Sequence, residues 1–165
     1  MFNMTEFEVN TVINKPVEIV VDALMNPDNF VHWQTDLEKF GVIERKPGEV
    51  GSIAHLHYSQ KGRSYIMEDK MIFCEPGKKY VSQVSGDVIT AKVETTLQSL
   101  GDKTKINLRW SGNGKIFLLK LLLPLMKGKM IKQSKKELDT FKHLIETRGS
   151  NFSEKVSNSN IKSNL

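Results

Sequence analysis

The chain has 165 residues, of which 39% are hydrophobic and 26% charged, a composition typical of one soluble globular domain. Its single cysteine, Cys74, excludes an internal disulfide. Residues 1–10 have neither the basic nor the apolar part of a secretory signal, so we expect a reducing, cytoplasmic location.

The net charge of +5 comes from one segment. Residues 115–136 contain seven lysines and no acid, and the other 17 of the 24 basic residues face 19 acidic ones elsewhere. A nucleic-acid-binding surface usually combines a broad basic face with interleaved aromatic side chains. The chain lacks that combination, so we expect no nucleic-acid partner.

The first predicted elements are one strand and two short helices. Apolar and polar residues alternate over 5–14, which predicts a half-buried strand. Pro16 is suited to the first turn of a helix, and Asn26-Pro27 ends that helix. A second short helix is predicted over 28–33, with Asp28 near its start.

The middle of the chain has the period-two pattern of strands separated by turns rich in Gly and Pro. The predicted strands cover 37–45, 50–60, 64–74, 79–85, 88–100 and 104–110. The Ser-Gly-Asn-Gly sequence at 111–114 then predicts a break before a long helix over 115–147, in which Pro124 predicts a kink. Residues 149–165 are rich in Ser, Asn and Lys, which predicts a disordered polar tail.

This order predicts an α+β fold. It is a curved, seven-stranded antiparallel sheet wrapped around a long C-terminal helix, with two short helices between strands 1 and 2. Three stretches carry a more specific likeness: Asn-Pro-Asp-Asn-Phe-Val-His-Trp at 26–33, Pro-Gly-Glu-Val-Gly-Ser at 47–52, and Phe141-Lys142. With them, residues 4–148 resemble the START-like (SRPBCC) superfamily with its Bet v 1-like helix-grip fold, in particular the polyketide cyclase/dehydrase-type branch. The resemblance implies one domain over 1–148.

The start of the long helix is unusually apolar. Residues 116–126 carry apolar side chains around most of the helix, but they include Lys120 and Pro124 and are too few to span a bilayer. We expect a flexible apolar gate with a basic rim, and peripheral contact with an anionic membrane through 115–136. A core helix with a solvated lysine face, or a dimer contact, is the alternative.

The leading hypothesis is that the domain binds or transports a hydrophobic small molecule or lipid between sheet and helix. Apolar burial would supply affinity, and His55, Tyr58, Tyr65 and Tyr80 would orient the ligand. We expect no cofactor, no metal and no catalytic residue. The predicted ligand-binding residues are Trp33, His55, His57, Tyr58, Tyr65, Met67, Met71, Tyr80, Val93, Leu108, Trp110, Leu118, Leu122 and Met126.

Two alternatives stay open. A cyclase or dehydratase would need a general acid and base in the cavity, with His55, His57, Tyr58, Tyr65, Asp69 and Tyr80 as candidates. A protein-interaction module of the chaperone-activator type would use the apolar, lysine-rich helix surface. His55 and His57 also have the spacing of two metal ligands, but two half-exposed imidazoles are the favoured interpretation. The sequence does not decide which face of strand 50–60 points inward.

Overall fold

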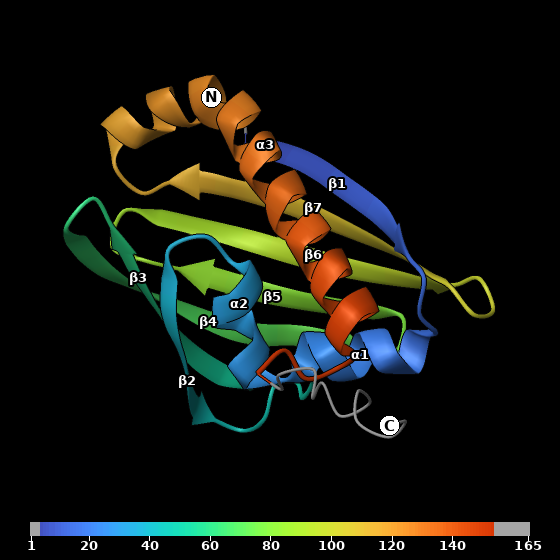
Figure 1. Cartoon of the computed structure of the whole chain (residues 1–165). Coiled ribbons are helices and arrows are strands. Elements are labelled where there is room, and N and C mark those ends of the chain that lie inside the picture. Colours follow the sequence, from blue (N-terminus) through green and yellow to red (C-terminus); the bar gives the residue numbers. More distant parts are fainter. Residues whose placement is uncertain (1–3, 154–165) are drawn as a thin grey trace, which may run out of the picture.

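The computed structural model describes residues 4–153. It has the predicted α+β architecture, a curved sheet with one long helix across its concave face and two short helices between the first two strands (Figure 1). The elements are β1 (Thr5–Ile13), α1 (Val17–Met25), the 3₁₀ turn η1 (Pro27–Asn29), α2 (Phe30–Trp33), β2 (Leu37–Glu44), β3 (Ile53–Gln60), β4 (Arg63–Glu75), β5 (Lys79–Ser85), β6 (Ile89–Ser99), β7 (Thr104–Gly114) and α3 (Phe117–Arg148).

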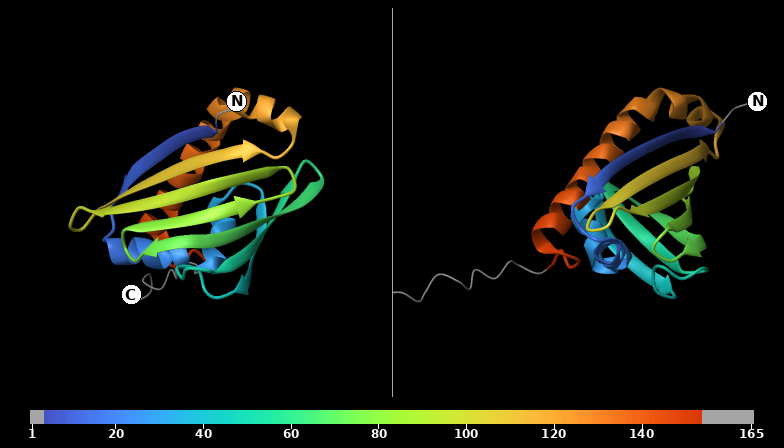
Figure 2. Two further views of the ribbon diagram at one scale, coloured as in Figure 1. Left: turned by 180° about the vertical axis from the view of Figure 1, so that it is seen from behind. Right: turned by 90° about the vertical axis from the view of Figure 1, so that its right-hand side faces the viewer.

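All seven strands form one antiparallel sheet in the order β1-β7-β6-β5-β4-β3-β2. Strands β2 to β7 therefore follow one another as a meander. Strand β1 pairs with β7 and forms the edge of the sheet opposite β2. The sheet twists strongly enough to make a trough, which the views from behind and from the side show open toward α3 (Figure 2). This confirms the predicted fold.

The last strand is longer than the sequence predicted. Residues 111–114 were expected to break the chain, but they continue β7, and Gly114 pairs with Ile89 of β6. A glycine is required here because a Cβ on Gly114 would lie 2.7 Å from the backbone nitrogen of Lys120 and 2.8 Å from the carbonyl carbon of Leu119. The end of β7 thus packs directly against the first turn of α3.

Helix α3 has two parts that differ in their surroundings. Its first turns lie at the rim of the sheet near the end of β7, and the helix then bends and crosses the concave face (Figures 1 and 2). Pro124 lies in the first part, where its missing N–H accounts for the bend. Buried side chains are spaced along the second part: Leu138, Phe141 and Ile145.

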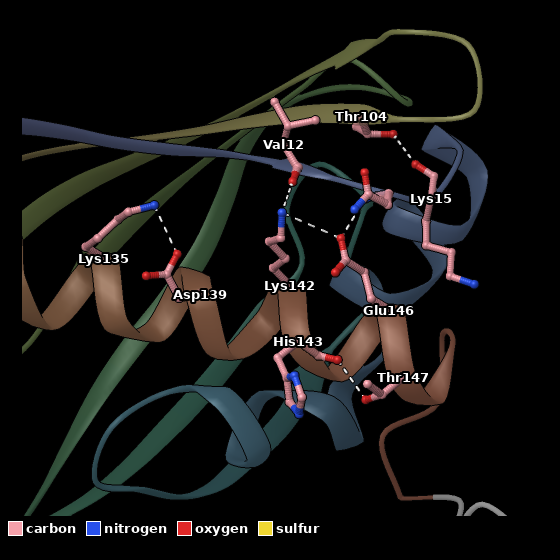
Figure 3. Close-up of polar contacts among 10 residues, drawn as sticks. Val12, Lys15, Thr104, Lys135, Asp139, Lys142, His143, Glu146 and Thr147 are labelled. Carbon is pink, nitrogen blue, oxygen red and sulfur yellow. Dashed lines mark hydrogen bonds and ion pairs between the residues drawn. The ribbon is translucent and has the colours of Figure 1, made fainter.

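Polar contacts tie the second part of α3 to β1 (Figure 3). The Lys142 ammonium donates to the Val12 carbonyl at 2.6 Å and lies 3.7 Å from the Glu146 carboxylate. That carboxylate accepts a hydrogen bond from the backbone N–H of Asn14 at 2.8 Å. These contacts fix the C-terminal part of α3 to β1.

The packed chain continues past α3. The side chain of Asn29 donates to the carbonyls of Ala23 and Ser150 and accepts from the N–H of Phe152. Phe152 is fully buried against Phe141. Residues 149–153 are therefore held against the domain, with Phe152 in the core, where the sequence predicted the start of a tail. The rest of that predicted tail, 154–165, lies outside the described residues.

Candidate ligand-binding cavity

A cavity of about 440 Å³ lies between the concave face of the sheet and α3. This volume falls within the range of roughly 300–1,000 Å³ found for small-molecule pockets. The helix contributes Met130, Gln133, Ser134 and Glu137, and the sheet contributes side chains from β1 to β7. The apolar part of the lining includes Phe7, Leu24, Phe30, Trp33, Phe40, Leu56, Met67, Met71, Val84, Val93, Leu108 and Trp110.

Aromatic pairs stiffen the apolar wall. Phe7 and Trp110 stack across β1 and β7 with ring centroids 5.5 Å apart. Phe30 of α2 stacks on Phe40 of β2 at 4.1 Å. Both tryptophans of the chain, Trp33 and Trp110, line the cavity. Such rings offer a large, pre-formed apolar surface to a bound molecule.

The side of the cavity near the β3–β4 hairpin is polar. The Tyr58 hydroxyl donates to the Gln34 side-chain carbonyl at 3.1 Å, and the Tyr58 ring stacks on that of Tyr65. Glu137 of α3 accepts from the Thr35 backbone N–H at 3.0 Å. Burial raises the pKa of the Tyr58 hydroxyl, and the negative charge of Glu137 raises it further. The hydroxyl therefore stays protonated and can donate or accept a hydrogen bond.

A carboxylic acid lies on the floor of the cavity. Asp69 occupies an inward position of β4, between Met67 and Met71. Burial raises the pKa of its carboxyl, while a hydrogen bond from Ser82 of β5 acts in the opposite direction. The sheet thus places one ionisable carboxyl among apolar side chains.

Nine of the predicted ligand-binding residues line this cavity: Trp33, Tyr58, Tyr65, Met67, Met71, Tyr80, Val93, Leu108 and Trp110. Among them, Tyr80 has its hydroxyl engaged, because that oxygen accepts from the Gly77 N–H at 2.9 Å. The structure brings these residues together from β3 to β7 and α2. Their role in binding remains a prediction.

The two histidines lie on the other face of the sheet. In β3 the inward residues are Ala54, Leu56 and Tyr58, so His55 and His57 point outward. His55 faces Glu68 across the strand pair, with Nε2 4.0 Å from the carboxylate. Both imidazoles are therefore remote from the cavity, and residues 4–153 contain no group of three His, Cys, Asp or Glu able to hold a metal ion.

The three helix residues of the prediction also lie outside the cavity. Leu118, Leu122 and Met126 are 62%, 40% and 43% exposed. They lie in the first turns of α3, at the rim, where Leu123 is the side chain that turns inward and is buried. The helical wall of the cavity comes from later turns, beginning at Met130.

No protein-family model matches the chain, and a search of curated proteins found no match. Solved structures do match. The Zhui aromatase/cyclase from Streptomyces sp. R1128 superposes with a TM-score of 0.72 and 14% identity over 88% of this chain and 95% of that chain. Ara h 8.0201 superposes with a TM-score of 0.70 and 14% identity over 87% of this chain and 99% of that chain. A START superfamily protein from Mycobacterium smegmatis superposes with a TM-score of 0.66 and 12% identity over 81% of this chain and 94% of that chain.

The chain has the START-like helix-grip fold. At this level of identity the likeness establishes the architecture and leaves the activity to be argued from the cavity itself. Within the fold, the predicted ligand-binding residues include eight sheet residues of the cavity lining and none from its helical wall. The sequence does contain a pattern from which the helical wall could have been predicted. A spacing of three and four residues places four side chains on one side of the helix: Met130, Gln133, Ser134 and Glu137.

A second surface of this helix-grip domain runs along the outside of α3. Steps of three and four residues align six exposed side chains in one stripe, apolar over the first turns and basic over the next: Leu118, Leu122, Leu125, Lys129, Lys132 and Lys136. Leu125 is 82% exposed. None of these three lysines makes an ion pair within residues 4–153. No helix within those residues is long and apolar enough to cross a bilayer.

Proposed function

We propose that this protein binds a hydrophobic small molecule or lipid in the cavity between the sheet and α3. The observation that carries the proposal is the 440 Å³ cavity itself, lined by both tryptophans and by apolar side chains from most strands. A domain that needed only stability would fill this volume, because a close-packed core is the norm and internal voids are costly.

The acid-base candidates for a cyclase or dehydratase divide between the two faces of the sheet. The imidazoles of His55 and His57 point away from the cavity, whereas Asp69, Tyr58, Tyr65 and Tyr80 line it, so only these four could act on a bound substrate. The thiol of Cys74 donates to the Gly48 carbonyl at 3.0 Å, and burial raises its pKa, so it is a poor nucleophile. Cys74 is a free thiol, and we include a cytoplasmic location, where thiols stay reduced, in the proposal.

The partner surface of the proposal is an anionic membrane. In the stripe from Leu118 to Lys136, the leucines would enter the acyl region while Lys129, Lys132 and Lys136 meet phosphate groups. The first turns of α3, which carry the leucines, lie at the rim of the sheet (Figure 1), and later turns of the same helix line the cavity. Docking there would let an apolar ligand pass between bilayer and cavity with little exposure to water.

Native mass spectrometry of gently purified protein tests the cavity. We expect an additional mass that is lost on denaturation. Val93→Trp, which places a large ring in the cavity, should reduce the occupied fraction, whereas Ile66→Trp on the outer face of β4 should not. The proposal fails if both variants carry the same extra mass as the parent, or if the parent carries none even after incubation with Nile red.

A further inference from the structure

The strands that form the floor of the cavity carry an acidic side chain but no basic one on the face that lines it. The chain carries a net charge of +5, yet the inward positions of β3, β4 and β5 hold one ionisable carboxyl, that of Asp69, and no cation. Across the cavity, α3 adds the carboxylate of Glu137. Burial raises the pKa of the Tyr58 hydroxyl most, and the negative charges of Glu137 and Asp69 raise it further.

Two cations, Arg45 and Arg109, are among the residues that line the cavity, and both side chains already have partners in the fold. Arg109 binds Glu6 at 3.1 Å and lies 3.9 Å from Glu8. Arg45 donates to the Val50 carbonyl at 3.2 Å, within its own turn. The three lysines of the stripe on α3, Lys129, Lys132 and Lys136, are exposed to solvent. A bound carboxylate would therefore meet the negative groups of Asp69 and Glu137 in a poorly hydrated space, while the Arg109 guanidinium is already paired with Glu6 and Glu8, which is unfavourable for an anionic ligand.

The position of Asp69 also breaks the pattern of its strand. Its neighbours on the inward face of β4 are Met67 and Met71, so an apolar side chain would suit this place better for folding alone. The carboxyl has one side-chain hydrogen bond, from Ser82. Since Asp69 lines the cavity, a carboxylate with one hydrogen bond has acceptor capacity left for a ligand. The stacked rings of Tyr58 and Tyr65 lie on the same lining and present faces that attract cations.

We propose that the ligand of this cavity is an apolar molecule with a protonated amine, which pairs with the Asp69 carboxylate and lies beside the Tyr58–Tyr65 pair. The apolar part of the ligand then occupies the wall around Trp33 and Trp110. This inference rests on the proposed ligand-binding function and specifies its chemistry.

The test is a matched series of three probes with the same alkyl chain: dodecylamine, dodecanol and dodecanoate. Each is titrated into the full chain below its aggregation concentration, and the fluorescence of Trp33 and Trp110 reports binding, because both rings line the cavity. A charge-assisted hydrogen bond in a poorly hydrated site corresponds to an affinity gain of about tenfold or more. We therefore expect dodecylamine to bind at least about tenfold more tightly than dodecanol, and dodecanoate most weakly.

Asp69→Asn keeps the size of the side chain and removes its charge. We expect this variant to retain dodecanol binding and to lose the preference for the amine. Glu68→Gln is the matched control, because Glu68 is the next residue of β4 and points to the outer face; it should retain the preference. Circular dichroism and dodecanol binding establish that each variant is folded.

The outcomes separate the two proposals. Tightest binding of dodecanoate would overturn the inference, since Asp69 would then act as a protonated donor to an anionic ligand. An amine preference that survives Asp69→Asn would overturn it as well. If dodecanol binds and the amine has no advantage, the amine inference fails and the cavity proposal stands. If none of the three probes binds, the cavity proposal itself fails.

Discussion

Two exposed leucines of α3 give the sharpest prediction about membrane docking. Leu118 and Leu125 are 62% and 82% exposed. Burying a complete leucine side chain is worth about 2 kcal/mol, so inserting the exposed parts of both contributes about 3 kcal/mol. Replacing both with glutamine should therefore weaken partitioning onto vesicles by more than about a hundredfold. Because the side chains make little contact within the fold, stability should change by less than about 0.5 kcal/mol per site.

The assay is flotation with vesicles of phosphatidylcholine alone or mixed with phosphatidylserine. The parent chain should bind the anionic vesicles and dissociate as salt rises, because the lysine contribution is screened. Ile43→Gln/Ile66→Gln is the matched control, since these residues are 58% and 52% exposed on the sheet. Equal flotation of the leucine variant and the parent would refute the reasoning. Failure of the parent to bind would leave the stripe as a protein-interaction surface.

Three further predictions concern the fold. Phe152→Ala should cost about 3–5 kcal/mol in urea unfolding, because this ring is fully buried; a loss below about 1 kcal/mol would show that 149–153 is not part of the core. Gly114→Ala should destabilise the chain by about 1–3 kcal/mol through its clash with α3, whereas Gly128→Ala, in open space, should stabilise it by up to about 1 kcal/mol. Equal effects would contradict the packing of β7 on α3. Burial raises the pKa of Asp69 above 3.8, so its contribution to stability is complete below that pH and is lost as pH rises through the raised value. The Asp69→Asn variant has no carboxyl to ionise here, so its free energy of unfolding minus that of the parent should increase from acidic to neutral pH. A difference that does not change with pH would contradict the burial of this carboxyl.

The sequence predicted the sheet and the helices well because their patterns are regular. Alternation over β6 and β7 gives the inward residues directly, and Val93, Leu108 and Trp110 line the cavity as expected. Strand β3 was harder, since both of its faces carry residues of intermediate polarity. The structure decides which face is inward, because Ala54 and Leu56 are buried and Leu56 pairs with Met67 of the cavity lining.

The helix shows why the rest of the site could not be predicted. Its first turns are apolar on most sides, so periodicity does not say which side is buried, and the choice of Leu118, Leu122 and Met126 followed from hydrophobicity alone. Their position depends on where β7 ends, and that depends on the close approach of Gly114 to the backbone of Lys120. Asp69 was considered only as a catalytic candidate, although alternation along β4 places it on the same face as Met67 and Met71, and all three line the cavity.

The measurement that tests the central claim most directly is Nile red binding to the Leu118→Gln/Leu125→Gln chain, in which the outer stripe no longer offers an apolar surface. We predict saturable binding with a blue-shifted emission, weakened at least about tenfold by adding Val93→Trp and unchanged by adding Ile66→Trp. Equal binding in the presence of Val93→Trp would contradict the account, because the dye would then occupy a site other than the cavity between the sheet and α3.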